Sequence, residues 1–223
     1  MAATLATMRV LLSGFEPFGG EAANASADAV LALADGWHHP HIEVWPVILP
    51  VTFTGAPALL KEAIERVRPD VVLCIGEAGL RTAVSPERWA VNEREARIPD
   101  NDGHRPSGPI DDGPARLASR IDVDAVVAAI QAAGVPAEAS EDAGRFVCNM
   151  TFRAALTTFD GPAGFIHVPA LRSSGKATIG AETDPDAGGA PQNVGASLSP
   201  ADLVTALRAA VETLGRTPWE ASI

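Results

Sequence analysis

The stretch that decides the fold is VVLCI at residues 71–75, an unbroken apolar run rich in β-branched residues. A run of this kind predicts a strand that is covered on both faces, as in a parallel sheet. Three more short apolar runs predict strands around it, at residues 9–13, 42–48 and 164–168. The second of them contains Pro46, which lacks a backbone N–H and therefore suits an edge strand.

Helical patterns separate these predicted strands. One runs from Thr54 to about Val67, and a second covers residues 122–133 with Gly134 at the position after the cap. A third begins with Ser-Pro-Ala-Asp at residues 199–202, which is a cap, a first-turn proline and an acidic residue, and it ends at Gly215. Strands that alternate with helices predict an α/β fold: a twisted, mostly parallel (mixed) sheet with helices on both faces, an α/β/α sandwich.

The length of 223 residues predicts one domain, which we place at residues 8–223. Residues 1–7 are expected to form an extended or disordered start. Two stretches rich in Gly and Pro or in Gly, Asp and Thr predict long loops, near 97–114 and 173–195. Loops of this length are usually lids or binding loops, so we expect the second one near a functional site.

The formal charge of −11 argues against a nucleic-acid partner and against docking on an anionic membrane. No apolar run approaches the roughly 18 residues that would span a bilayer, and the start of the chain has no signal-peptide pattern. The only cysteines, Cys74 and Cys148, cannot build a disulfide framework. They suit a reducing compartment, so we expect a cytoplasmic protein.

Cys148 is the first candidate for chemistry. It ends a short apolar run that starts at Gly144, and a helical pattern follows it through Phe152 and Phe159. A thiol at the start of a helix lies near unpaired backbone N–H groups, which lower its pKa and can hold an oxyanion. The alternative is an inert buried thiol, which is also the interpretation favoured for Cys74 in the middle of its apolar run.

His167 and Glu87 are weaker candidates when each is taken alone. His167 lies near the carboxyl end of a predicted strand, where ligands bind in open α/β sheets, and it could serve as a base for a thiol. It could equally be a core histidine. Glu87 lies beside an apolar run and could orient an imidazolium, but it could also be an ordinary surface carboxylate.

The turn GFEPFGG at residues 14–20 follows the first predicted strand. It lacks both Gly-rich phosphate-binding patterns, so we do not expect a nucleotide. Phe15 and Phe18 in a glycine-rich turn suit a small flat apolar ligand instead, because aromatic faces can enclose a planar ring.

Seven segments, taken together and in order, resemble the pyroglutamyl peptidase I (pyrrolidone-carboxylate peptidase) family. The resemblance extends from Met8 to about Gly215. The segments that carry it are GFEPFGG at 14–20, LPVTF at 49–53, GEAGLR at 76–81, ERWAVN at 87–92, ARIPDN at 96–101, AGRFVCN at 143–149 and GFIHVP at 164–169.

The resemblance implies a cysteine exopeptidase that hydrolyses the bond after an N-terminal pyroglutamyl (5-oxoprolyl) residue through a thioacyl-enzyme. It implies Cys148 as the nucleophile, His167 as the base and Glu87 as the acid, with Arg97 near the oxyanion. It also implies no metal, no cofactor, a peptide as the substrate and a homo-oligomer, either a tetramer or a dimer. The positions that match the substrate pocket are Phe15, Phe18, Asn24, Glu77, Phe146 and Val147.

This sequence departs from the family pattern at several positions. Glu77 stands where glutamine is common, which replaces an amide donor with an acceptor, and Leu80 replaces a common glycine. Met150 and Arg153 stand where histidine and tyrosine are common, and residues 170–174 lack the usual aromatic residue and glutamine. No member of the implied triad is lost, so we expect activity to be retained.

Two other functions compete with the peptidase. One is a binding protein for a small molecule on the same scaffold, in which Cys148 is merely buried. The other is an amidase that acts on a free lactam or another acyl amide. An enzyme that depends on a nucleoside triphosphate is disfavoured because no phosphate loop is complete.

Overall fold

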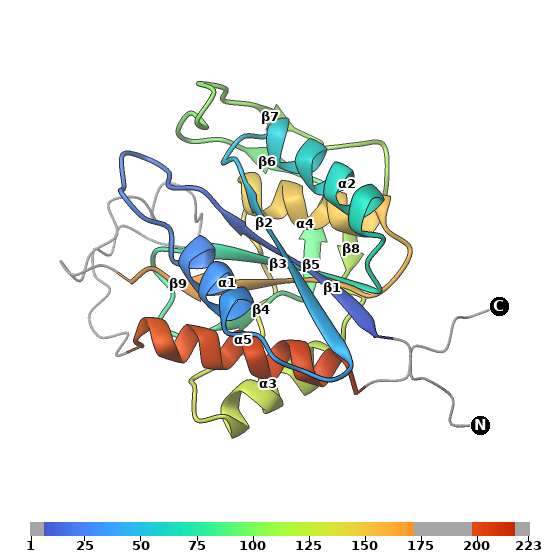
Figure 1. Cartoon of the computed structure of the whole chain (residues 1–223). Helices are drawn as coiled ribbons and strands as arrows, with labels where there is room; N and C mark the ends of the chain where they lie inside the picture. Colours follow the sequence, from blue (N-terminus) through green and yellow to red (C-terminus); the bar gives the residue numbers. More distant parts are fainter. Residues whose placement is uncertain (1–6, 172–197, 217–223) are drawn as a thin grey trace.

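The computed structural model describes residues 7–171 and 198–216, and its centre is a five-stranded sheet (Figure 1). The strand order is β2-β1-β3-β9-β4. The first four strands are mutually parallel, and the short β4 pairs antiparallel with β9. The strands span Met8–Phe15 (β1), Ile42–Leu49 (β2), Val71–Ala78 (β3), Ser85–Pro86 (β4) and Ala163–Pro169 (β9).

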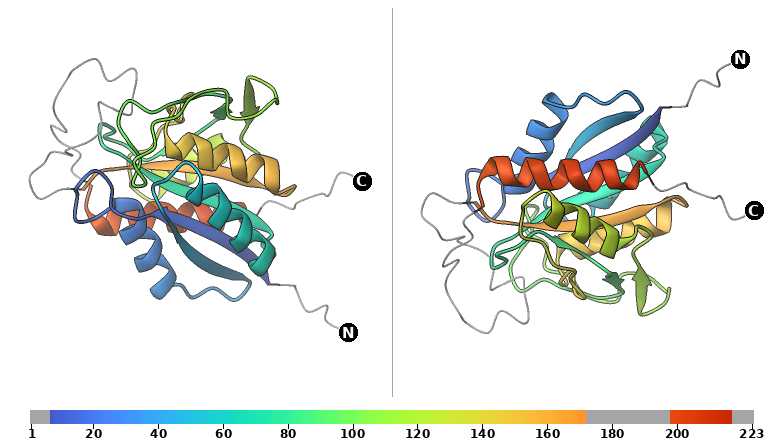
Figure 2. Two further views of the ribbon diagram at one scale, coloured as in Figure 1. Left: turned by 90° about the horizontal axis from the view of Figure 1, so that it is seen from above. Right: turned by 90° about the horizontal axis from the view of Figure 1, so that it is seen from below.

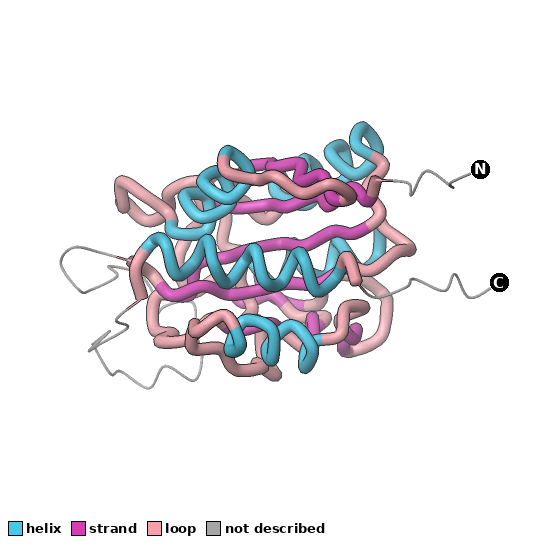
Figure 3. The backbone as a smooth tube through the Cα atoms, turned by 60° about the horizontal axis from the view of Figure 1, so that its bottom comes forward, coloured by secondary structure: helices cyan, strands magenta, loops and turns pink. Residues whose placement is uncertain are grey.

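Helices cover both faces of this sheet (Figures 2 and 3). On one face lie α1 (Ala25–Asp35), α3 (Val123–Ala132) and α5 (Pro200–Leu214). On the other face lie α2 (Gly55–Val67) and α4 (Val147–Thr158). The predicted α/β/α sandwich with a mostly parallel, mixed sheet is therefore confirmed.

Two small antiparallel pairs lie outside the main sheet. β5 (Trp89–Val91) pairs with β8 (Arg116–Ala118), and β6 (Arg94–Glu95) pairs with β7 (Ser107–Gly108). The second pair lies partly within the predicted loop at 97–114, which is otherwise irregular. These short strands carry no clear sequence pattern and were not predicted.

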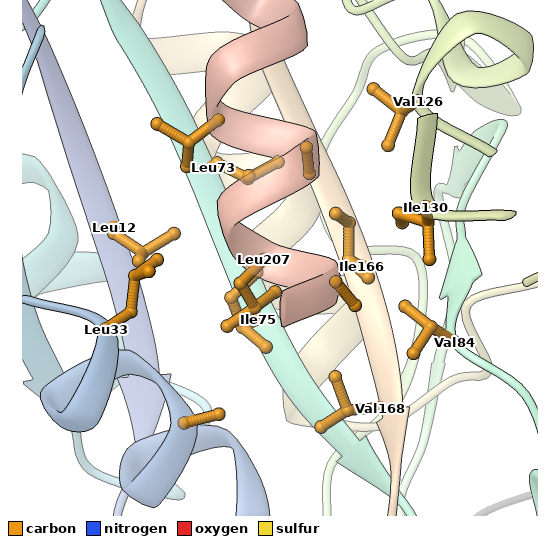
Figure 4. Packing of buried hydrophobic residues seen from close by; sticks show 14 of the residues in the cluster. Leu12, Leu33, Leu73, Ile75, Val84, Val126, Ile130, Ile166, Val168 and Leu207 are labelled. Atoms are coloured by element: carbon orange, nitrogen blue, oxygen red, sulfur yellow. The ribbon is translucent and has the colours of Figure 1, made fainter. Parts of the chain in front are cut away.

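The core consists of two apolar layers, one on each face of the sheet. In the layer under α5, Leu73 and Ile75 of β3 and Ile166 of β9 lie beneath Leu207, and all four side chains are inaccessible to solvent (Figure 4). Burying leucine or isoleucine side chains of this size stabilises a fold by about 1.5–3 kcal/mol each. None of the helices in the described ranges is long and apolar enough to cross a bilayer.

Local signals fixed the helix ends where the sequence predicted them. Ser199 and Asp202 form a reciprocal capping box at the start of α5. Arg68, the residue before Pro69, adopts a left-handed conformation with φ of 49° and ends α2. Gly134 after α3 has a φ of 85°, which a glycine adopts without strain.

Two outcomes qualify the predicted organisation. Helix α1, which begins after the cap Asn24, was not predicted, although its buried residues recur at a helical spacing. The predicted loop at 173–195 and most of the predicted N-terminal extension at 1–7 lie outside the described residues. Pro46 does lie on the edge strand β2, opposite Leu12 of β1, as predicted.

The strand order places a binding site. From β1 the chain crosses to β2 on one side, whereas from β3 it leads to β9 on the other. The strand order therefore reverses between β1 and β3. In open α/β sheets the crevice at such a point, outside the carboxyl ends of the strands, is where ligands bind.

The packing of α1 gives a matched test of core energetics. Leu33 is inaccessible to solvent, whereas Leu31, two residues earlier on the same helix, is 49% exposed. We expect Leu33→Ala to lower the free energy of unfolding by about 2–5 kcal/mol, because it leaves a cavity. Leu31→Ala should change it by no more than about 0.5 kcal/mol. Urea unfolding of both variants checks this, and equal losses would contradict the packing described here.

Candidate active site

A cavity opens at the predicted position, at the carboxyl ends of β1, β3 and β9. Phe15 is the last residue of β1, Glu77 is the second-last residue of β3, and His167 is near the end of β9. All three line the cavity together with Cys148 at the start of α4. Four residues that lie far apart in the sequence therefore face one space.

His167 is held from behind by a buried carboxylate. Its Nδ1 lies 2.7 Å from Oε1 of Glu87, whose side chain is inaccessible to solvent. Strand β4 pairs Ser85 with His167, and the Glu87 backbone N–H donates to the carbonyl of Phe165 at 2.9 Å. A carboxylate can only accept, so Nδ1 carries the proton and Nε2 is left as the basic nitrogen.

Cys148 is the second residue of α4, after the cap Phe146 and the first residue Val147. The cap makes no side-chain hydrogen bond, and the first N–H groups of a helix have no partner within the helix. The thiol therefore stands at the positive end of α4, among donors that can hold an oxyanion.

The next residue, Asn149, fixes the start of α4. Its side chain donates to the carbonyls of Val91 and Glu93 at 3.0 Å and accepts from the Val91 N–H at 2.9 Å. This side chain is inaccessible to solvent. It both donates to and accepts from the backbone of Val91 in β5, as the backbone of a paired strand would. The segment that carries Glu87 thus also positions the nucleophile helix.

Gly76 provides the space in which the sulfur lies. It pairs with His167 across β3 and β9. A Cβ built on Gly76 would lie 2.8 Å from Sγ of Cys148 and 2.7 Å from the ring of Phe165. Any side chain at this position would displace the sulfur, so a glycine is required beside His167.

The pKa of the Cys148 thiol differs from the sequence-based expectation. Burial, followed by the carboxylates of Glu87 and Glu77, raises this pKa to about 12, and Arg81 opposes them. We expected the helix N-terminus to lower this pKa. The expectation did not account for the protein atoms packed around Cys148, which is only partly exposed and whose charged form they disfavour. The thiol is therefore neutral at pH 7 and needs a base before it can attack.

Cys74 behaves as expected for a buried thiol. It lies within β3 with no solvent exposure, and burial raises its pKa to about 12 as well. Its side chain is not among the residues that line the cavity. It is the natural reference for the reactivity of Cys148.

Aromatic rings form the apolar wall of the cavity. Phe18 and Phe146 lie with ring centroids 5.2 Å apart, and Phe53 meets Phe146 edge-on at 5.1 Å. Phe15, 1% exposed, lines the cavity from β1, and Val147 completes the apolar lining at the start of α4. Walls of this kind suit a flat uncharged ring.

Asn24 and Glu77 supply polar atoms at the N-terminus of α1. Asn24 caps the helix, accepting from the Ser26 N–H and hydroxyl, and donates to the carbonyl of Glu16. Glu77 accepts from the Ala25 N–H at 2.7 Å. Asn24 thus serves chiefly to hold the turn and the helix together, and a carboxylate at 77 is favoured by the helix end that it faces.

Arg97 is the predicted site residue that the structure does not bring to the cavity. Its side chain is exposed, and its carbonyl accepts from the guanidinium of Arg105. The loop from 97 to 105 folds on itself rather than toward the sulfur. Arg153, which replaces a common tyrosine, is buried and forms a bidentate pair with Asp111, so it ties this loop to α4.

Sequence reasoning missed three contributors, namely Gly76, Arg81 and Asn149. Each lies within a segment that carried the family resemblance. Their roles depend on which strands become neighbours, and no local pattern reports that. The available signals were their presence in these segments and, for Gly76, its position directly after the predicted central strand.

Comparisons with known proteins point to one family. Residues 8–217 match the sequence profile of the family described as pyroglutamyl peptidase. A pyrrolidone-carboxylate peptidase of Streptococcus pyogenes serotype M4 is 44% identical over 169 residues, which are 73% of this chain and 78% of that protein.

Solved structures give the same result. Pyroglutamyl peptidase I from Bacillus amyloliquefaciens matches with a TM-score of 0.81 and 34% identity over 95% of this chain and 96% of that one. Pyrrolidone carboxyl peptidase from Thermococcus litoralis matches with a TM-score of 0.80 and 29% identity, over 93% of each chain.

The raised pKa of Cys148 gives a direct test. A thiol reacts with iodoacetamide as the thiolate, so its alkylation rate should still be climbing at a pH where a free cysteine has levelled off. Glu77→Gln removes one negative charge and should lower the midpoint by roughly half a unit. The measurement is mass-spectrometric alkylation against pH, with Cys74 as the unreactive reference.

Glu62→Gln, on the exposed surface of α2, is the matched control and should leave the midpoint unchanged. A midpoint that stays the same in Glu77→Gln would contradict the electrostatic role described for this carboxylate.

Proposed function

The chain belongs to the pyroglutamyl peptidase family, and we propose that it removes N-terminal pyroglutamyl residues from peptides with Cys148, His167 and Glu87 as its catalytic triad. As a member of this family it is a hydrolase of the thiol peptidase type. The observation that carries the residue assignment is the shared cavity of Cys148 and His167, backed by the 2.7 Å contact from His167 to Glu87.

The ring of the substrate is a neutral lactam, which needs apolar walls and a few polar partners. We assign the walls to Phe15, Phe18 and Phe146, with Val147 beside the thiol. The carboxylate of Glu77 is an acceptor at the edge of the same space and suits a lactam N–H. Only the first residue of a peptide is recognised by such a pocket, so the rest of the peptide should be loosely selected.

Attack by the thiol is coupled to a proton transfer. His167 accepts the thiol proton at Nε2 as Sγ of Cys148 bonds to the carbonyl carbon that joins the pyroglutamyl group to the next residue. The raised pKa of the thiol means that this transfer accompanies attack rather than preceding it. Glu87 holds the ring in the required tautomer and stabilises the imidazolium.

The carbonyl oxygen becomes an oxyanion in the tetrahedral intermediate. We assign it to the backbone N–H groups at the start of α4, because these donors are preorganised and have no partner within the helix. This assignment replaces the expected contribution of Arg97, whose side chain is exposed and outside the cavity.

Collapse of the intermediate breaks the C–N bond, and the imidazolium of His167 gives its proton to the leaving amine. The acyl group then remains on Cys148 as a thioester. His167 next takes a proton from water, whose oxygen attacks the thioester carbon. Breakage of the C–S bond releases pyroglutamate and restores the thiol.

Exclusion of other residues follows from the same pocket. Free glutamate would place an unpaired carboxylate against apolar walls and beside Glu77, which costs several kcal/mol. A prolyl residue lacks the lactam oxygen, so a group that donates to that oxygen would be left unpaired. We therefore propose discrimination against both.

We also propose a cytoplasmic homo-oligomer, a tetramer or a dimer. The support for the compartment is the pair of free cysteines. The support for assembly is an exposed tryptophan on the edge strand of the sheet, Trp45 on β2, which is 45% exposed. Multi-angle light scattering should give a mass of at least twice 23.1 kDa, and a monomer at micromolar concentration would contradict the proposal.

The triad is tested by release of a fluorescent amine from a pyroglutamyl-amide. We expect Cys148→Ala to reduce kcat by about 10³-fold or more, because the nucleophile is lost. Cys74→Ala is the matched control and should keep the activity, since that thiol lies outside the cavity. The prolyl analogue should not be hydrolysed by any of these proteins.

Equal activity of wild type and Cys148→Ala would sink the cysteine mechanism. Absence of turnover by the folded, reduced wild type would instead favour a binding protein for a small molecule. Hydrolysis of 5-oxoproline itself would indicate an amidase that acts on free lactams.

A further inference from the structure

Beyond the triad, the structure assigns a positioning role to Arg81, whose guanidinium joins the carboxylate behind the histidine to the loop that leads into the nucleophile helix. We infer that Arg81 holds Glu87 in place behind His167 during the reaction. This inference rests on the proposed peptidase function, because the role it assigns is a role in that reaction.

The first observation is a shared oxygen atom. Nη2 of Arg81 lies 3.1 Å from Oε1 of Glu87, and the same oxygen lies 2.7 Å from Nδ1 of His167. Within the described residues, Arg81 is the only permanently charged cation within 4 Å of this carboxylate. The other carboxylate oxygen, Oε2, is buried and has no hydrogen-bond partner there.

Burial makes this cation consequential. The Glu87 side chain has no solvent exposure, so water cannot compensate its charge. Removing the cationic partner of a buried carboxylate leaves an uncompensated charge, which is strongly destabilising. The guanidinium therefore compensates and holds the carboxylate that faces His167.

The second observation is a link to the nucleophile. The same Nη2 donates to the carbonyl of Asp142 at 2.9 Å. The carboxylate of Asp142 accepts in turn from the Gly144 N–H at 2.9 Å, within the loop that leads into α4. One guanidinium therefore fixes the position of Glu87 relative to the loop that leads into α4, the helix that carries Cys148.

Arg81 lies close to the end of the central strand. Strand β3 ends at Ala78, and the Arg81 N–H donates to the Ala78 carbonyl at 3.1 Å in the turn that follows. The side chain is 20% exposed and lies at the rim of the cavity. Its partners are protein groups, which is why we describe it as positioning rather than catalytic.

Several ionisable groups surround this cation. Glu87 and His167 face it from the β4 and β9 side, Cys148 from α4, Glu77 from β3, and Asp142 from the preceding loop. Arg81 opposes the two carboxylates that raise the pKa of the thiol. Loss of its charge should therefore favour both the imidazolium and the protonated thiol.

The test compares Arg81→Met, which removes the charge but keeps most of the length, with Arg81→Lys, which keeps the charge. The matched control is Arg88→Met. Arg88 follows Glu87 directly, but its side chain pairs with Asp124 and Glu141 instead of the triad. We measure kcat and KM for the pyroglutamyl-amide against pH, and alkylation of Cys148 by iodoacetamide against pH.

We expect Arg81→Met to lower kcat by about 10- to 100-fold. This loss is part of the rate enhancement that general base catalysis supplies. KM should change little, and both limbs of the pH profile should move to higher pH by roughly half a unit or more. Arg81→Lys should restore the limbs toward their original positions with a partial recovery of kcat. Arg88→Met should resemble wild type in all of these measurements.

Unchanged limbs in Arg81→Met would overturn the inference, and so would a rise in KM at constant kcat, which would mean that Arg81 contacts the substrate. If Arg81→Met does not fold, Arg81→Gln takes its place, and unchanged limbs in that variant would overturn the inference in the same way. If wild type shows no turnover, the proposed function fails, and the alkylation profiles still decide the role of Arg81.

Discussion

A carboxylate removed from water governs the arrangement of this site. Glu87 is inaccessible to solvent, and a buried charge is tolerated only where donors and cations meet it. The short strand β4 pairs with β9 and so brings Glu87 beside His167. Oε1 of Glu87 lies 2.7 Å from Nδ1 of His167. The same segment continues into β5, which Asn149 binds, so the position of the acid and the position of the nucleophile helix have a common origin.

Two electrostatic influences act on the thiol in opposite directions. The N-terminus of α4 favours the thiolate, whereas burial and the carboxylates of Glu87 and Glu77 favour the neutral form and prevail, raising the pKa to about 12. A neutral resting thiol is less exposed to oxidation and to stray alkylation than a thiolate. The nucleophile is therefore generated only where His167 can take its proton, which couples reactivity to the geometry of the pair.

Features that depend on a few neighbouring residues could be read from the sequence. The apolar run at 71–75 is the central strand β3, and the Ser199 box begins α5. Cys148, His167 and Glu87 were each ambiguous alone, and only the ordered family segments joined them. Other features depend on how distant segments pair in the sheet, which local sequence propensity does not report. They are the short strand β4, the contact between Arg81 and Glu87, and the requirement for glycine at position 76. The pKa of Cys148 could not be predicted because burial is a property of the folded chain.

The order of strands has a consequence for synthesis. β3 and β4 are made early, yet β9, which lies between them, follows only at residue 163. Until then the emerging chain carries an apolar strand with an open edge, the kind of surface that pairs with other chains. Strand β9 also carries His167, so a ribosome-bound chain acquires its base in the same step that fills the gap between β3 and β4. A chain truncated before β9 would be both inactive and prone to aggregate, which makes hydrolytic activity a reporter of completed folding.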